Sequence, residues 1–497
     1  MAKKYILAVD QSTSGTKASL ISGELTIDYQ VSVAHSQHYP KPGWVEHDPE
    51  EIWQNVRKVI LKVVQEGNVS WSEIAAIAVT NQRETGLIWD SETGKPVYNA
   101  IVWQCSRAKE QCGQLAKDNE IAEYIRKKTG LHLSPYFTAP KIQWILNNIT
   151  GLKEKASTGR LKFGTVDSWI IWNLTGRKVH ATDYSNASRT LLLDLEKLRW
   201  DQKLLDIFEI PCQMTPEIKP SDSIFGYTAG DSDIPDGIPI SGVMGDSHAA
   251  LFGQNCFSIG MTKATYGTGS SVMMNTGSKP VFSDNGIVTS IGWITSEDKV
   301  YVLEGNINFS GRTIQWLVDA GFISSPKETG EIASKLSDNG GVYLVPAFTG
   351  LGSPYWDNSA KATVTGLTLT SKTAHIVRAA EESIVYQITD ILDIMQIDSG
   401  IKIAELRVDG GATGDSFLMQ FQSDIANTKV VISKEKELTS LGSACMAGLA
   451  TGFWKNRGEL EQRRSVSAVY TPQIDEDKRT MYKKGWQDAV SRALSYK

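Results

Sequence analysis

Residues 5–17 read YILAVDQSTSGTK, an apolar run that ends at Asp10 and passes into a turn of small polar residues. The unbroken run 5–9 predicts a buried β-strand, and residues 18–21 predict a second strand after the turn. Successive backbone N–H groups in such turns form anion-binding nests, and a carboxylate at a strand tip can hold Mg²⁺ directly or through water. The stretch is a candidate phosphate site, although taken alone it fits an ordinary β-hairpin turn better.

A second turn of the same kind lies in the other half of the chain. Residues 261–266 predict a strand, and GTGSS at 267–271 follows it. Two such turns can clamp one triphosphate between them. A predicted strand at 405–408 leads to Gly410 and Gly411, where the backbone can approach a flat ligand such as adenine or simply turn into a helix. The chain contains no G-x-x-x-x-G-K-[ST] motif, which disfavours a P-loop NTPase.

The length of 497 residues exceeds one ordinary core and predicts two domains, which we place at residues 1–252 and 253–497. The formal net charge of −5 disfavours a nucleic-acid or membrane-surface binder, and no apolar run is long enough to cross a membrane. The five cysteines contain no C-x-x-C pair, which disfavours a disulfide framework or zinc site and points to a reducing cytoplasm.

Helical and irregular segments can also be expected from the pattern. Amphipathic spacing predicts helices over 49–66 and 121–128, and a further helix begins near Ser416. The small residues from Ser440 predict a helix that packs closely against a sheet. Residues 211–240 are rich in proline, glycine and serine and predict an irregular surface segment.

Two charged residues, Arg83 and Glu84, follow a predicted strand at 74–80. Together they offer donors and acceptors to a polyol, but a surface ion pair is the simpler interpretation of the pair alone. The indole of Trp103 can cover the carbon face of a polyol, although a tryptophan in an apolar run usually belongs to the core.

Asp246 follows GVMG and precedes Ser247 and His248. A carboxylate flanked by glycine can accept a hydroxyl proton during phosphoryl transfer, but the residues around Asp246 taken alone favour a cap for the helix that follows. Adjacent aspartate, serine and histidine also suggest a serine hydrolase. That class is disfavoured because a triad needs proximity in space rather than in sequence, and because no G-x-S-x-G elbow is present.

Longer stretches carry a more specific signal: residues 39–47 (YPKPGWVEH), 80–85 (TNQRET), 98–105 (YNAIVWQC), 163–167 (FGTVD), 183–190 (DYSNASRT), 345–352 (VPAFTGLG) and 417–424 (FLMQFQSD). With the turns above, they resemble the FGGY carbohydrate kinase family over nearly the whole chain. The likeness is greatest to members that phosphorylate glycerol.

The resemblance implies an α/β fold of the actin-like ATPase (ribonuclease H-like) type, with two domains around a central cleft, ATP and Mg²⁺ as cofactors, and a dimer or tetramer. It implies that Asp10 organises Mg²⁺ and Asp246 is the general base. The remaining nucleotide residues would be Thr13, Ser14, Lys17, Thr268, Gly311, Gln315, Gly411 and Asp415. The polyol would be bound by Arg83, Glu84, Trp103, Tyr136, Asp246 and Ser247.

Four positions depart from the family's usual pattern. Ser247 replaces a glutamine and Ser271 a phenylalanine in the polyol pocket, which makes the pocket larger and more polar. Lys17 replaces an arginine at the phosphates, and Asp415 replaces an asparagine near the adenine. The expected activity is ATP-dependent phosphorylation of glycerol. A longer polyol, such as a tetritol or pentitol, and a non-catalytic ATP-binding protein of the actin-like class are the alternatives.

Overall fold

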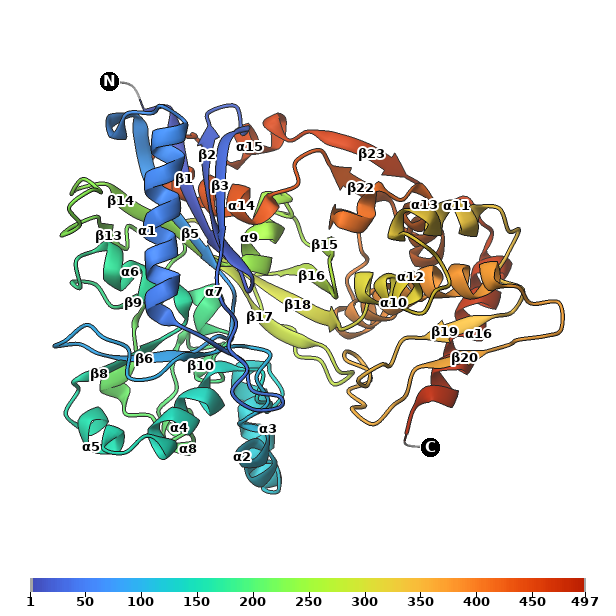
Figure 1. Ribbon diagram of the computed structural model, residues 1–497, viewed down its shortest axis with the longest axis horizontal. Coiled ribbons are helices and arrows are strands. Elements are labelled where there is room, and N and C mark those ends of the chain that lie inside the picture. The colour runs from blue at the N-terminus through green and yellow to red at the C-terminus, as the bar shows by residue number, and fades with distance from the viewer. Residues whose placement is uncertain (1–2, 496–497) are drawn as a thin grey trace.

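The computed structural model describes residues 3–495 and contains two mixed β-sheets, one in each half of the chain (Figure 1). The first has six strands in the order β13-β14-β5-β1-β2-β3. These are β1 (Tyr5–Gln11), β2 (Gly15–Ser22), β3 (Ile27–Ala34), β5 (Ile74–Asn81), β13 (Gly226–Tyr227) and β14 (Pro239–Gly245). The second has seven strands in the order β17-β18-β16-β15-β21-β22-β23. These are β15 (Met261–Tyr266), β16 (Ser270–Gly277), β17 (Val288–Ile294), β18 (Lys299–Ile307), β21 (Glu405–Gly410), β22 (Val430–Ser433) and β23 (Val466–Tyr470).

The two sheets share a pairing pattern. In the first, β1 pairs antiparallel with β2 and parallel with β5. In the second, β15 pairs antiparallel with β16 and parallel with β21. The turn after β1 and the turn after β15 therefore occupy equivalent positions, as the similar turns in the sequence predicted.

Alternate residues of β1 point to opposite faces of the first sheet, as the period of a strand requires. Leu7 and Val9 pack with helices α1 (Pro49–Glu66) and α6 (Val166–Leu174), whereas Ile6 and Ala8 pack with α9 (Asp246–Gly253) and α14 (Leu438–Ala450). Because both faces are covered, the strand is apolar without a break.

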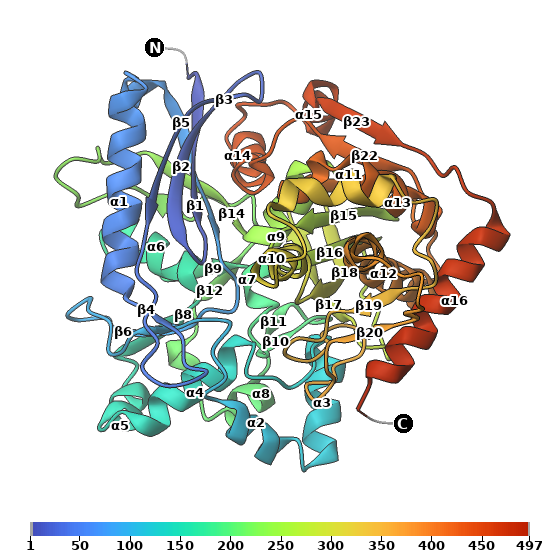
Figure 2. The same ribbon diagram turned by 45° about the vertical axis from the view of Figure 1, so that its right-hand side comes forward.

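Helices α9 and α14 lie between the two sheets, and their side chains form one core with residues of both (Figure 2). Their backbones approach so closely that a Cβ on Gly442 would lie 1.8 Å from the Ala249 carbonyl oxygen. The small residues of α14 are thus required by the packing, as the sequence predicted. The same packing means that a segment of the C-terminal half covers the N-terminal sheet.

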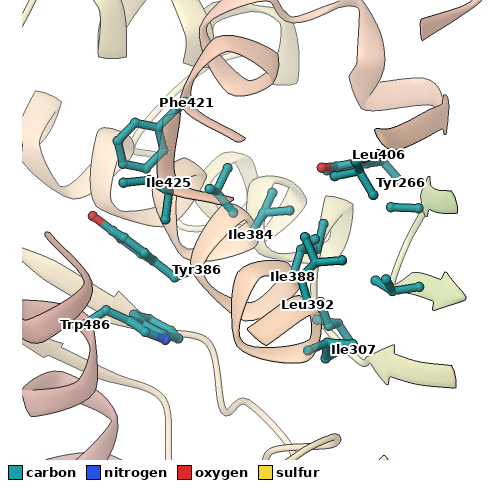
Figure 3. Close-up of a cluster of buried hydrophobic side chains, with 14 of the residues drawn as sticks. Tyr266, Ile307, Ile384, Tyr386, Ile388, Leu392, Leu406, Phe421, Ile425 and Trp486 are labelled. Atoms are coloured by element: carbon teal, nitrogen blue, oxygen red, sulfur yellow. The ribbon is translucent and has the colours of Figure 1, made fainter. Parts of the chain in front are cut away.

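The far face of the second sheet is covered by α12 (Thr373–Ser399) and α13 (Ser416–Ala426), and α16 (Glu476–Ala493) packs against these helices from outside. Ile384, Ile388 and Leu392 extend from α12 toward the sheet (Figure 3). On the outer side of α12, the rings of Tyr386 and Trp486 stack with centroids 5.2 Å apart. This core fixes α12 and α13 beside the turns of the second sheet.

Most of residues 84–214, apart from α6, form a further layer below the first sheet (Figure 1). Its elements are β6 (Leu87–Asp90), β7 (Ala100–Ile101), α2 (Lys109–Leu115), α3 (Asn119–Thr129), α4 (Thr138–Asn148), α5 (Leu152–Ser157), β8 (Leu161–Gly164), β9 (Ala181–Asp183), α7 (Tyr184–Ala187), β10 (Leu193–Asp194), β11 (Arg199–Trp200) and α8 (Gln202–Ile207). Shorter elements elsewhere are β4 (Glu46–His47), β12 (Glu217–Lys219), α10 (Gly311–Asp319), α11 (Thr329–Ser334), β19 (Tyr343–Val345), β20 (Thr363–Thr365) and α15 (Arg457–Arg463).

The predicted strands and helices are present, and residues 211–240 are mostly irregular. One alternative was wrong: Asp246 is not a helix cap. Gly245 holds the N-cap position of α9, and Asp246 is the first helical residue. None of the helices between residues 3 and 495 combines the length and apolar character needed to cross a bilayer.

Candidate active site

Three strands of the first sheet deliver polar residues to one edge. β5 is parallel to both β1 and β14, and Thr80 on β5 lies opposite Asp10 on one side and Met244 on the other. The carboxyl ends of parallel strands meet at the same edge of a sheet. Asp10, Arg83 and Asp246 therefore lie at one edge although they are far apart in the sequence.

The guanidinium of Arg83 connects this edge to the second sheet. Its Nε donates to Asp246 Oδ1 at 3.0 Å, and its Nη1 and Nη2 each donate to one oxygen of Glu304 at 2.9 Å. Nη2 also donates to Ser247 Oγ at 3.2 Å. Arg83 is only 5% exposed, so the interpretation of a surface ion pair with Glu84 was wrong.

Glu84 is paired instead with a second buried arginine. Arg189 Nε donates to Glu84 Oε1 at 2.6 Å, and its Nη1 lies 2.9 Å from Glu304 Oε2. Burial alone would raise the pKa of Glu304, but Arg189 and Arg83 hold that pKa well below its ordinary value. Glu84 has a φ of 61°, a conformation rare for a residue with a side chain and common at functional sites.

Sequence reasoning missed the roles of Arg189 and Glu304. Arg189 lies in the quoted stretch 183–190, but no partner could be assigned to it. Glu304 is a single carboxylate within the mostly apolar, buried strand β18, which was the signal available. An isolated charge in a buried strand needs a partner of opposite sign, and only the fold shows which.

Trp103 and Tyr136 form an aromatic wall beside this network. Their ring centroids lie 5.6 Å apart at 65°, and the Trp103 Nε1–H donates to Thr13 Oγ1 at 2.9 Å. Buried Lys141 donates to the Phe137 carbonyl at 2.8 Å and also to the Tyr136 carbonyl, which fixes the backbone that carries the Tyr136 ring. Trp103 packs against a buried hydrophobic cluster and also borders a cavity.

All six predicted polyol residues line one cavity of about 710 Å³: Arg83, Glu84, Trp103, Tyr136, Asp246 and Ser247. Thr13, Ser14, Thr268 and Ser271 line it too. Ser271 Oγ lies 3.5 Å from Ser247 Oγ, so both unusual serines face the same space. The cavity also contains a cation that the sequence did not single out, Lys263, which is 1% exposed and donates to Thr265 Oγ1 at 3.1 Å.

A second cavity of about 720 Å³ adjoins the first, and Gly267 and Thr268 line both. The predicted nucleotide residues Thr268, Gly311, Gln315, Gly411 and Asp415 all border it. A Cβ on Gly411 would meet no atom within 4 Å, so the backbone there is open to a ligand.

Neither cavity is lined by Asp10 or Lys17. Lys17 Nζ pairs with Glu437 Oε2 at 2.7 Å, a partner that the sequence did not suggest. Asp10 is 7% exposed, and its Oδ1 is buried with no hydrogen-bond partner in the part of the chain that the structure describes. Burial, and then the nearby charge of Asp246, raise the pKa of Asp10 to about 7. An orphaned buried carboxylate of this kind fits a cation.

The serine-hydrolase alternative finds no support in this geometry. His248 Nε2 forms a hydrogen bond with Ser290 Oγ at 3.2 Å. Ser247 Oγ accepts a hydrogen bond from Arg83 and faces Ser271. The histidine therefore does not contact the serine that it would have to activate.

Comparison with known proteins assigns the family. The N-terminal domain profile of the FGGY family of carbohydrate kinases matches residues 5–253, and the C-terminal domain profile matches residues 262–451. The chain belongs to the FGGY family of carbohydrate kinases. The two-domain actin-like fold expected of this family is confirmed.

Individual relatives of this FGGY kinase resemble it along its whole length. Glycerol kinase 1 of Thermotoga maritima is 51% identical over 99% of this chain and 100% of its own. Glycerol kinase of Carboxydothermus hydrogenoformans is 50% identical over 100% of this chain and 99% of its own. The crystal structure of Plasmodium falciparum glycerol kinase with ADP superposes with a TM-score of 0.94 at 39% identity, covering 99% of both chains.

Proposed function

We propose that this protein is a glycerol kinase, which transfers the γ-phosphoryl group of ATP to a terminal hydroxyl of glycerol and yields sn-glycerol 3-phosphate. The observation that carries the proposal is the junction of two cavities at Gly267 and Thr268. One is bordered by charged and aromatic groups suited to a small polyol, and the other by open backbone suited to a nucleotide. The full-length likeness to glycerol kinases supports the same substrate.

Asp246 is the general base of the proposed reaction. Its hydrogen bonds from Arg83 Nε and from the Ser247 N–H both go to Oδ1, which leaves Oδ2 for the substrate hydroxyl. Asp246 takes the proton of the substrate's terminal hydroxyl while the oxygen of that hydroxyl forms a bond to the γ-phosphorus. The bond from phosphorus to the β–γ bridging oxygen breaks, and ADP leaves.

The rest of the first cavity orients the polyol. Glu84 accepts from its hydroxyls, Arg83 donates to them, and the Trp103 and Tyr136 rings cover its carbons. Burial raises the pKa of Tyr136, so its phenol stays neutral and can donate a hydrogen bond. Phosphoryl transfer depends mainly on such positioning and on charge.

Asp10 would hold Mg²⁺, in part through water, and the cation would neutralise charge on the phosphates. Between residues 3 and 495, no cluster of three or more histidine, cysteine or acidic side chains is suited to a metal. Mg²⁺ keeps several of its waters and binds phosphate oxygens alongside one or two carboxylates, so Asp10 would not need a cluster of protein ligands around it.

A polyol panel with MgATP, ranked by kcat/KM, tests the proposal. Glycerol is expected to rank first, and ATP consumption without any polyol is expected to be slow because the cleft must exclude water. A four- or five-carbon polyol that exceeds glycerol by more than about tenfold would show the glycerol assignment to be wrong. Rapid ATP hydrolysis without polyol would contradict coupling between the two cavities.

A longer polyol is the second candidate, favoured by one observation. Ser247 and Ser271 put two small hydroxyl side chains on the same part of the cavity wall. They leave space for the additional carbons of a longer polyol and can form hydrogen bonds with its additional hydroxyls. The same panel decides between the candidates.

We also propose a cytoplasmic location and a homodimer or homotetramer. All five cysteines are free thiols, in keeping with a reducing compartment. Light scattering after size-exclusion chromatography measures the oligomeric state, and cell fractionation checks the location.

A further inference from the structure

Two acidic side chains face the nucleotide cavity next to each other. Glu381 lies on α12 and is 1% exposed, and Asp415 precedes α13; both line the cavity. Asp415 Oδ1 accepts from the N–H groups of Phe417 and Leu418 at 2.9 and 3.2 Å, so this oxygen is occupied by helix capping. Glu381 Oε2 is buried, and no N–H or O–H group among residues 3–495 donates to it. A buried polar atom left unpaired at a cavity wall indicates a missing ligand group.

The two carboxyls do not both carry a charge at neutral pH. Burial raises the pKa of Glu381 to about 10, together with the nearby charge of Asp415 and a hydrogen bond between the two side chains. Arg378 on the same helix does not neutralise Glu381, because its Nε donates to Glu382 Oε1 at 2.7 Å. Glu381 is therefore a carboxylic acid with an O–H to donate, beside a carboxylate that accepts.

The surroundings fit a flat aromatic base. Ile314, Ile384 and Leu418 supply apolar contact, while Gly411 and Gly414 leave open space where side chains would stand. The cations at this cavity are Arg312 and Lys327, on α10 and on the 3₁₀ turn Pro326–Glu328. A base with a donor and an acceptor on one edge would satisfy both carboxyls.

We propose that Glu381 binds the nucleobase, donating its O–H to a ring nitrogen of adenine while Asp415 accepts from the adjacent exocyclic amino group. This rests on the proposed use of ATP, and it identifies Glu381 as a specificity-determining residue. A protonated carboxyl is required because a carboxylate would meet the lone pair of the ring nitrogen with a lone pair of its own.

The test measures nucleotide binding by calorimetry, without turnover. ADP is compared with 1-deaza-ADP and 7-deaza-ADP, each of which lacks one ring nitrogen, in the parent, in Glu381→Gln and in Glu381→Met. One of the two analogues is expected to bind the parent at least about tenfold more weakly than ADP, the cost of leaving the O–H unpaired. The Gln variant keeps this preference because its amide N–H can donate. The Met variant, of similar size, loses it.

Equal affinity of the parent for all three nucleotides would overturn the proposal, as would a preference that persists in Glu381→Met. If the Met variant does not fold, pH gives an independent measurement: the parent's preference for ADP falls as pH rises toward 10, while that of Glu381→Gln does not. A parent preference that is independent of pH would then overturn it. If ADP binds as expected but no polyol is phosphorylated, only the proposed reaction fails.

Discussion

The Arg83 Nε donates a 3.0 Å hydrogen bond to Asp246 Oδ1, joining residues 163 positions apart in the chain. The same guanidinium is held by Glu304 from the second sheet. The proposed base is thereby oriented by a group that is itself fixed by both halves of the molecule. Such support holds a catalytic carboxylate in one geometry without using its second oxygen.

Asp246→Asn is expected to lower kcat by at least about a hundredfold, because the amide keeps the shape of the side chain but cannot accept the proton. MgATP binding and thermal stability should stay close to those of the parent. Steady-state kinetics, calorimetry and thermal melting measure the three quantities. A variant that folds, binds both substrates and turns over at nearly the parental rate would remove Asp246 from the mechanism.

Ser271→Phe is expected to lower the KM for glycerol and to abolish activity on longer polyols. Ser271 lines the polyol cavity, and an aromatic ring there would add apolar contact and exclude water. Kinetics with glycerol and a pentitol measure both effects. An unchanged KM for glycerol together with retained pentitol activity would mean that this position does not contact the substrate.

Glu304→Gln is expected to destabilise the protein by about 3–5 kcal/mol at pH 7, since it leaves two buried guanidiniums without their shared carboxylate. The pKa of Glu304 is depressed in the folded state, so its stabilisation is complete above its unfolded pKa and is lost only as the pH falls through the folded pKa. Urea unfolding measures the change.

Glu331→Gln is the matched control for that measurement. Glu331 is exposed and pairs with Lys335 one helical turn away, so its removal should have little effect. Equal losses in the two variants would contradict the role assigned to the buried network.

Lys141→Met tests whether Lys141 fixes the backbone that carries Tyr136, and its effect on the free energy of unfolding depends on pH in a defined direction. Burial lowers the pKa of Lys141 from 10.5 to about 7. Between these values the unfolded chain binds a proton that the folded protein does not, so this residue's contribution to stability increases with pH. The unfolding free energy of the parent minus that of the variant should rise by up to about 1.4 kcal/mol per pH unit above pH 7.

Urea unfolding at pH 7, 8 and 9 measures that difference, and a constant or falling value would contradict the assignment. The variant should also show a higher KM for the polyol, because the carbonyls of Tyr136 and Phe137 lose their donor. An unchanged KM would mean that Lys141 does not position Tyr136.

Local sequence determined much of the architecture. Helix α1 has the predicted bounds because its apolar spacing, its N-terminal Pro49 and its capping Asp48 act within a few residues. Strand β15 likewise has the predicted bounds, since β-branched and aromatic residues that end at a glycine turn are a local signal. Arg83, Glu84 and Trp103 could be named before the fold was known because they lie in long stretches that resemble one family.

Only the tertiary structure decided how those residues are paired. The sequence neighbours Arg83 and Glu84 do not form an ion pair with each other. Arg83 pairs with Glu304 and Glu84 pairs with Arg189, and both partners come from distant segments. The position of Glu381 beside Asp415 depends in the same way on how α12 packs against α13. Hydrogen bonds and charge interactions act over a few ångströms of space, and a residue's spatial neighbours are set by sheet register and helix packing rather than by its position in the chain.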